Sequence, residues 1–337
     1  MARASLLNAG GQRLYGRLEG RITSRLAHRS HRARAMSEHP LGPAIDGTRR
    51  EWRPGAPELG QVCCYVAERR RGRPLVLVHD LRSTSSAREM RPLFESFRWR
   101  RPTFALDLPG FGLSERTRRP YEPALFALAL AELLRKLRAR FASADVVALG
   151  RGAEAASRVA VAEQGLIRSL ALLEPAGLLS PRDQSLQRLA ARLALSLGDR
   201  AARGLFSLMS TRPWIRRSLR ERFRGAPDPG LVEYAHASAH VPGAHHAPLA
   251  ALALRRGHPE TTQLYHSLTI PVLVVHDVRG THAIELEAFL RGRSNRFAMR
   301  VAPTRGMPQF ERRCDTVSAL ERFWQSLSGA AWDQAMR

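Results

Sequence analysis

Short aliphatic runs that alternate with longer helical patterns are the feature that most constrains how this chain can fold. Strands that alternate with helices pair in parallel through right-handed crossovers, and helices then cover both faces of the sheet. We therefore predict an α/β fold with a mostly parallel central sheet. The predicted strands are 74–79, 103–108, 145–149, 169–173, 271–275 and 297–302.

Two segments depart from this alternation and divide the chain. From about 180 to 267 the pattern is almost entirely helical and polar-striped, which is typical of an inserted cap. The stretch up to about residue 53 is rich in arginine, and Pro40, Pro43 and Gly47 mark a linker near its end. The predicted organisation is an N-terminal arm and linker at 1–53, a core at 54–179 and 268–330, and a helical cap at 180–267.

The formal net charge of +24 predicts an anionic partner. An acidic protein and an anionic membrane surface fit this charge, and nucleic acid fits it less well. Lys136 is the only lysine, so the compositional bias of a GC-rich genome also contributes, although it does not explain the excess over acidic residues. We expect a cytoplasmic protein, which could also lie at a membrane surface or within a larger complex. No apolar run reaches about 18 residues, and the adjacent Cys63 and Cys64 are unsuited to bond to each other, which is typical of a reducing compartment.

Two basic segments are the predicted contacts for that partner. Arg13, Arg17, Arg21 and Arg25 recur every four residues, so a helix would carry them as one stripe. The arm is open to three interpretations: a transit peptide, an amphipathic helix that docks on a membrane or partner, or a solvated arm. In the cap, the run 203–224 mixes apolar and basic residues, and its predicted contacts are Arg216, Arg217 and Arg220.

Four motifs in the body of the chain carry a resemblance to a known family: LVHD at 77–80, ALDLPGFGLS at 105–114, LEPAG at 173–177 and PTRGMPQFE at 303–311. Together they resemble the capped branch of the α/β-hydrolase superfamily over about 74–324. The resemblance implies a serine nucleophile on a sharp strand-to-helix turn, an acid after a later strand and a histidine near the carboxyl end.

None of the three positions that the resemblance implies holds a catalytic side chain. The nucleophile position falls on Gly150 or Gly152, depending on the alignment, and the histidine position falls on Gly306. The acid position falls on Gly280 or on its neighbour Arg279. The sequence therefore predicts a degenerate triad and a non-catalytic protein kept for binding or assembly.

Two other function classes stay open. An atypical hydrolase or lyase could use acidic groups in a cap-covered pocket, and a small-molecule receptor could use the same pocket. Asp80 stands where a glycine normally lets backbone N–H groups approach an oxyanion, so its carboxylate opposes acyl transfer. It could instead act as a base or pair with Arg82 or Arg151. The pocket candidates are His79, Asp80, Arg151, Glu154, Glu174, Asp277 and Met307.

No metal or cofactor site is predicted. His236 and His240 are four residues apart and share a helix face, but no third ligand is close to them in sequence. The glycines around residue 150 lack the spacing of a phosphate-binding or dinucleotide-binding loop. A pocket filled by Arg151 or Met307 would exclude both the enzyme and the receptor alternatives.

Overall fold

The computed structural model describes residues 41–68, 70–178, 185–254, 259–277 and 281–328. The chain divides into two compact units, 1–42 and 43–337, and the features below belong to the second unit. The arm arginines from Arg13 to Arg25 lie outside the described residues, and so does Gly280.

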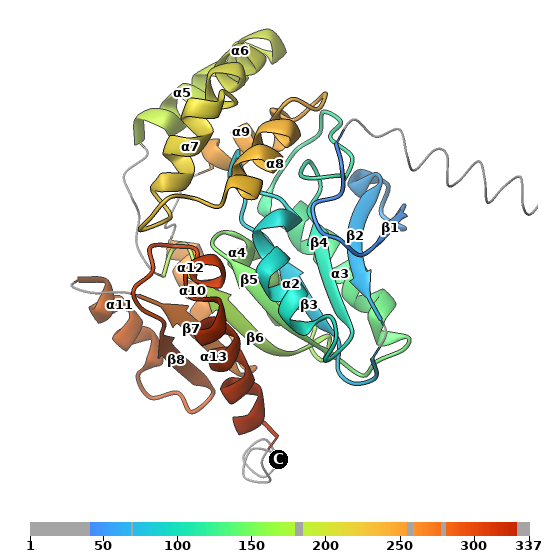
Figure 1. Ribbon diagram of the computed structural model, residues 1–337, viewed down its shortest axis with the longest axis vertical. Coiled ribbons are helices and arrows are strands. Elements are labelled where there is room, and N and C mark those ends of the chain that lie inside the picture. Colours follow the sequence, from blue (N-terminus) through green and yellow to red (C-terminus); the bar gives the residue numbers. More distant parts are fainter. Residues whose placement is uncertain (1–40, 69, 179–184, 255–258, 278–280, 329–337) are drawn as a thin grey trace, which may run out of the picture. The chain divides into compact units, whose positions relative to one another are not determined.

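Eight strands form one sheet in the order β1-β2-β4-β3-β5-β6-β7-β8 (Figure 1). β1 and β2 pair antiparallel, as do β2 and β4, and every other pair in the sheet is parallel. The six predicted strands are therefore confirmed as strands of a mostly parallel sheet. The bounds are β1 (Thr48–Trp52), β2 (Val62–Ala67), β3 (Leu75–Val78), β4 (Thr103–Asp107), β5 (Ala144–Leu149), β6 (Ile167–Leu173), β7 (Val272–His276) and β8 (Arg296–Arg300).

β1 and β2 are strands that the sequence pattern did not predict. β1 lies within the segment that the sequence assigned to the arm and linker, and its residues are exposed or half-buried, as in an edge strand. β2 is buried along its whole length between β1 and β4. The sheet therefore begins before residue 53.

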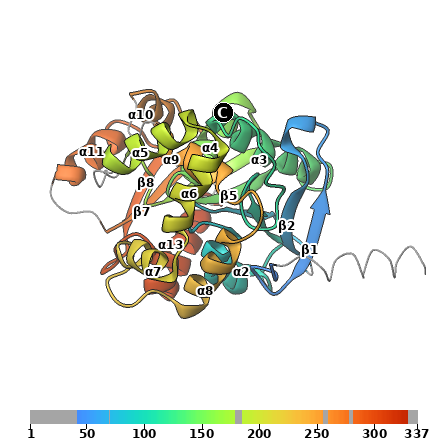
Figure 2. The same ribbon diagram turned by 90° about the horizontal axis from the view of Figure 1, so that it is seen from above.

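Helices cover both faces of the sheet (Figure 2). One face carries α3 (Pro123–Arg138), α4 (Gly152–Ala162), α10 (Pro259–His266) and α11 (Thr281–Leu290). The other carries α2 (Arg91–Phe97), α12 (Pro308–Glu311) and α13 (Arg313–Ser326), where Phe97 packs edge-on against Trp324. Two short 3₁₀ helices, η1 (Pro57–Leu59) and η2 (Ala87–Met90), complete the core. Although α10 falls in the range assigned to the cap, it packs against α4 beside the sheet.

A helical insertion follows β6 and precedes α10 and β7. It comprises α5 (Ser185–Ser196), α6 (Asp199–Met209), α7 (Arg212–Arg220), α8 (Pro229–Ala239) and α9 (His246–Ala253). Contacts join this cap to the loops at the carboxyl-terminal ends of the strands, including a hydrogen bond from Arg116 to the carbonyl oxygen of Ser238 at 2.7 Å. Ligands bind at this end of parallel sheets, so the space beneath the cap is the place for a functional site.

Candidate functional site

The turn between β5 and α4 places Gly150 at its apex. Gly150 has a φ of +55°, a left-handed conformation that residues with a side chain rarely adopt. A nucleophile on a strand-to-helix turn occupies such a strained apex. Gly152 is instead the first residue of α4, and a Cβ there would collide with the carbonyl oxygen of His79. Of the two alignments, the backbone therefore favours Gly150 as the apex.

The carboxylate of Asp80 fills the space beside Gly150. A Cβ on Gly150 would lie 2.6 Å from the carboxyl carbon of Asp80, so a side chain at the apex and Asp80 exclude each other. Oδ1 of Asp80 accepts hydrogen bonds from the backbone N–H groups of Arg151 at 2.9 Å and Leu81 at 2.8 Å. In enzymes with such a turn, the amide after the apex and an amide of the loop after β3 form the oxyanion hole. Here the chain's own carboxylate occupies that position.

Two guanidinium groups neutralise Asp80. Its Oδ2 lies 2.8 Å from Nε of Arg82 and 3.4 Å from Nη2 of Arg222. Burial opposes ionisation of this carboxyl group, but Arg82 and Arg222 outweigh that effect and hold the pKa of Asp80 well below its usual range. Asp80 is therefore a fixed anion that cannot accept a proton usefully near neutral pH.

Arg222 comes from the cap, just beyond α7, and is 5% exposed. Its Nη1 donates to Oε1 of Glu89 at 2.6 Å, and Oε2 of Glu89 accepts the backbone N–H of Asp80 at 3.0 Å. A Cβ on Gly306 would lie 3.7 Å from Cβ of Arg222, so this arginine stands beside the position implied for the histidine. Arg222 and Glu89 were not among the predicted site residues, because in an arginine-rich run no local signal marks the one arginine that becomes buried.

Met307 and Gln309 are buried next to this network. Nε2 of Gln309 donates to the backbone oxygen of Glu89 at 3.1 Å and lies 3.8 Å from the sulfur of Met307. Neither side chain titrates, so the segment 303–311 supplies no proton shuttle among these buried groups.

Glu174 and Asp277 meet at the ends of β6 and β7. The Asp277 carboxylate accepts the Thr304 N–H at 2.8 Å and pairs with Arg300 at 3.2 Å. Oε1 of Glu174 accepts the Asp277 N–H at 3.1 Å, and Glu174 has a φ of +46°. Burial raises the pKa of Glu174 to about 7, against the lowering effect of that hydrogen bond. Glu174 could therefore exchange protons near neutral pH, but no nucleophile stands at Gly150 to use it.

His79 and Glu154 have contacts that give them structural roles. Nε2 of the buried His79 accepts the backbone N–H of Leu108 at 3.0 Å, and burial lowers the pKa of this imidazole, so it stays neutral. Glu154 pairs with Arg158 one turn along α4 at 2.9 Å. Neither residue lines the cavity beneath the cap.

A cavity of about 300 Å³ lies between the cap and the carboxyl-terminal ends of β3 and β5. Arg151 and Met307 therefore do not fill this space, although Arg151 contributes to its wall. Its ionisable lining consists of three arginines and one glutamate rather than a pair of proton-transfer groups. The lining residues are Leu81, Arg82, Ser83, Arg151, Gln187, Met209, Trp214, Arg217, Ser218, Glu221, Pro248 and Leu252.

The outer surface of the cap exposes a leucine stripe. Leu186, Leu189, Leu193 and Leu197 follow one face of α5 and its end, and their exposed fractions are 81%, 55%, 54% and 77%. Leu208 on α6 is 66% exposed. The predicted partner contacts Arg216, Arg217 and Arg220 are also exposed, on α7. We call these exposed leucines, together with the exposed arginines of α5 to α7 other than Arg217, the outer cap surface; Arg217 lines the cavity beneath the cap.

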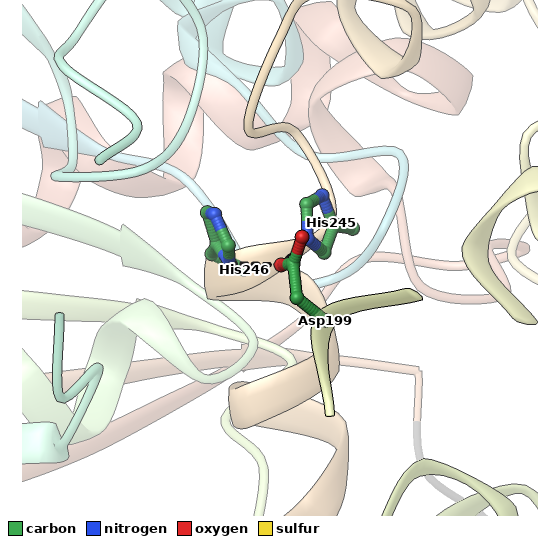
Figure 3. Close-up of side chains that lie close together, drawn as sticks. All are labelled: Asp199, His245 and His246. Atoms are coloured by element: carbon green, nitrogen blue, oxygen red, sulfur yellow. Dashed lines mark hydrogen bonds and ion pairs between the residues drawn. The ribbon is translucent and has the colours of Figure 1, made fainter. Parts of the chain in front are cut away.

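Asp199, His245 and His246 form the one candidate metal-binding group found among the described residues (Figure 3). Nε2 of His245 lies 2.8 Å from Oδ1 of Asp199, and Nδ1 of His246 lies 3.8 Å from the same oxygen. The other carboxylate oxygen pairs with Arg203 at 2.9 Å. The adjacent guanidinium opposes a metal cation, so we assign to this cluster the role of joining α6 to α9. The rings of His236 and His240, at the end of α8, have centroids 4.3 Å apart and are tilted by 37° to each other.

No helix in the described part of the chain is long and apolar enough to cross a bilayer.

Comparison with known proteins identifies the architecture. A family model described as the alpha/beta hydrolase family matches residues 75–330, whereas no curated protein sequence matches the chain. Similar solved structures include an enol-lactonase from Burkholderia xenovorans LB400, with 15% identity, a TM-score of 0.61 and coverage of 82% of this chain and 100% of that one. A haloalkane dehalogenase loop variant from Bradyrhizobium elkanii has 17% identity, a TM-score of 0.63 and coverage of 85% and 99%. A membrane phospholipase A has 18% identity, a TM-score of 0.62 and coverage of 95% and 98%. At these identities the likeness shows the fold alone.

Proposed function

This chain belongs to the alpha/beta hydrolase family, and we propose that it uses the fold of a hydrolase as a non-catalytic binding or assembly protein. One observation carries the proposal. The Asp80 carboxylate occupies the side-chain space at Gly150 and accepts the N–H groups of Arg151 and Leu81, so neither a nucleophile nor an oxyanion has room at the turn.

The magnitude of the expected loss supports this proposal. Removing a nucleophile or its base lowers the rate of a triad hydrolase by about 10⁶-fold, and removing one oxyanion donor costs a further factor of about 10² to 10³. In this chain Gly150 and Gly306 stand at the implied nucleophile and histidine positions, and an anion occupies the hole. A degenerate triad therefore accounts for the site better than an unorthodox hydrolase or lyase does.

The outer cap surface supports an anionic membrane surface as the partner. From residue 185 to 220 the chain carries eight arginines and one acidic residue, Asp199. Exposed leucines beside arginines suit the boundary between lipid head groups and acyl chains, where leucine is buried and arginine meets anionic lipid. Nucleic acid would use the arginines but would leave the leucines in water, so it fits this surface less well.

The test of non-catalysis uses the purified full-length chain with a serine-reactive fluorophosphonate probe and a panel of short-chain esters. We expect no labelling and no turnover above that of the heat-denatured protein. Turnover that is abolished by Glu174→Gln or by Asp277→Asn would overturn the proposal in favour of an atypical hydrolase.

The test of the partner is flotation with vesicles of phosphatidylcholine, with and without phosphatidylglycerol. We expect binding only to anionic vesicles and weakening as salt rises. The double variant Leu189→Gln/Leu193→Gln should bind at least about tenfold more weakly, because it loses buried apolar area. Ile284→Gln on α11 is the control, since Ile284 is likewise an exposed aliphatic residue, at 66%, but lies outside the cap. Equal losses in both variants, or dimerisation through the leucines, would contradict a membrane partner.

The cavity beneath the cap favours a second candidate function, the reception of a small molecule. Its volume of about 300 Å³ is at the lower end of the range for small-ligand sites, and it opens over the ends of β3 and β5.

A further inference from the structure

Arg151 is a buried cation without a carboxylate partner. The residue is 7% exposed, and its backbone N–H is already bonded to Asp80. Nη1 of its guanidinium donates to the carbonyl oxygen of Ala251 on α9. Among the described residues no acidic side chain forms an ion pair with this guanidinium, and Nε and Nη2 have no protein acceptor. A buried charge with no partner is costly, so this position calls for an anion.

The nearby carboxylates are already committed to other cations. Asp80 pairs with Arg82 and Arg222, and Glu89 pairs with Arg222. Glu154, which also lies close enough to act on the charge of Arg151, pairs with Arg158. Three carboxylates therefore meet three guanidinium groups, and the charge of Arg151 is left over. Burial lowers the pKa of Arg151, but an arginine side chain keeps its proton in proteins, so the excess positive charge stays in place.

Arg151 lines the cavity beneath the cap, and the other lining residues indicate the charge and polarity of the ligand that would fit there. Arg217 on α7 adds a second cation, while Glu221 is the one carboxylate in the lining. With Arg82 matched by Asp80, the lining carries a net single positive charge. Leu81, Met209, Trp214, Pro248 and Leu252 supply apolar surface, and Ser83, Gln187 and Ser218 offer neutral hydrogen-bonding groups.

We propose that this cavity binds a small amphipathic monoanion. Its head group, a carboxylate or another singly charged oxyanion, contacts the free edge of the Arg151 guanidinium, which suits paired acceptor oxygens. Its apolar body lies against Trp214 and Met209 within the volume of about 300 Å³. This site rests on the proposed function in one respect, that the bound molecule is held and not converted.

The test is isothermal titration of the full-length protein with octanoate, octyl sulfate, octan-1-ol and octylammonium at low salt. We expect one-to-one binding of the two anions, with octan-1-ol and octylammonium at least about tenfold weaker, because the contact to the head group is charge-assisted. Tighter binding of octanoate than of octyl sulfate would assign the site to a planar carboxylate, and the reverse order would assign it to a tetrahedral oxyanion. Equal affinity for octanoate and octan-1-ol would overturn the proposal.

Three variants locate the site. Arg151→Gln should weaken octanoate at least about tenfold while leaving octan-1-ol unchanged, and the retained octan-1-ol binding shows that the cavity is intact. Octanoate should raise the Tm of the parent protein and not that of Arg151→Gln. Arg217→Gln, at an exposed position, should weaken octanoate by about threefold. Full affinity in Arg151→Gln would overturn the proposal.

Two control variants distinguish binding in the cavity from binding at the outer cap surface, and the ester assay distinguishes binding from catalysis. Leu189→Gln/Leu193→Gln alters the outer leucine stripe, and Arg212→Gln alters an α7 arginine that pairs with Glu233 outside the cavity. Both variants should keep one-to-one octanoate binding. Failure of both anions to bind, in a protein without hydrolytic activity, would overturn this site alone. Ester turnover would overturn the proposed function and leave the anion site standing.

Discussion

The arginines at the two faces of the cap have opposite environments. Arg222, on the inner face, is almost fully buried and pairs with both Asp80 and Glu89. Arg216 and Arg220, a few residues earlier in the same arginine-rich run, are exposed on α7. This difference shows that the arginines of the cap have two separate structural roles. On the inner face arginine pairs with buried carboxylates and fixes the cap to the core, and on the outer face its charge is exposed to solvent.

Arg222→Met tests the inner face and should have the largest effect. The substitution leaves Glu89 buried without its cation and removes one of the two partners of Asp80. We expect the free energy of unfolding to fall by about 3 to 5 kcal/mol, as measured by urea denaturation. Arg220→Met is the matched control at an exposed position and should change it by less than about 0.5 kcal/mol. Equal effects would remove the distinction between the two faces.

If Arg222→Met alone fails to fold, the double variant Glu89→Gln/Arg222→Met can still test whether charge pairing makes Arg222 necessary. It removes the isolated buried charge together with its partner, so it should recover much of the lost stability. A double variant no more stable than the single one would mean that packing, and not charge, makes Arg222 necessary.

Gly150→Ala tests whether Asp80 holds its place at the turn. The new methyl group would meet the Asp80 carboxylate at 2.6 Å and would force alanine into a left-handed conformation. We expect a loss of about 3 kcal/mol in thermal denaturation, from strain and overpacking combined. Gly225→Ala is the control, because a Cβ there meets nothing within 4 Å. An unchanged Tm in Gly150→Ala would show that Asp80 can leave the oxyanion hole.

Glu174 predicts a pH dependence of stability that an exposed carboxylate would not give. Burial raises its pKa from an ordinary value of 4.5 to about 7, so between these values the folded state binds a proton that the unfolded state has lost. Stability should therefore fall as pH rises from about 4.5 to 7, by roughly 2 kcal/mol after allowance for partial exposure. Glu174→Gln should remove this slope in urea denaturation measured across that range. A slope that persists in the variant would assign it to another group.

Leu189→Gln tests the outer face and should have the smallest effect on stability. Leu189 is 55% exposed, so its replacement removes little buried apolar area. We expect the free energy of unfolding to change by less than about 0.5 kcal/mol, measured by urea denaturation. A loss several times larger would mean that the leucine stripe packs within this chain and is not free for a partner.

The sequence predicted much of the fold because most of the parallel strands contain short aliphatic runs, as in β3, β5 and β7. The helical insertion stood out by its polar-striped helical pattern, whereas β1 is a polar edge strand and looked like a linker. The glycines at the implied nucleophile and histidine positions could also be identified from the sequence, because they lie within recognisable motifs. Which of Gly150 and Gly152 lies at the apex of the turn could be decided only from the positive φ of Gly150, and motif spacing does not reveal a backbone angle.

The charges of the site could be predicted only in part. The position of Asp80 already indicated a carboxylate opposed to an oxyanion, and Arg82 was one of its expected partners. Arg222 and Glu89 could not be found in the same way, because their pairing joins residues 133 positions apart through tertiary packing. Arg151 was identified as a residue of the turn, but its lack of a counter-charge became visible only once every neighbouring carboxylate had a partner.

The interlocked contacts around Gly150 also bear on whether a catalytic triad could be introduced into this chain. A serine at Gly150 meets Asp80, and a glycine at position 80 leaves Arg82 and Arg222 with one carboxylate fewer. A histidine at Gly306 would stand in van der Waals contact with Arg222 and would have to adopt a φ of +145°, which residues with a side chain rarely do. Each of these single substitutions towards a triad is therefore expected to lower stability. The proposed non-catalytic state is one that no single substitution at these positions would reverse without that loss.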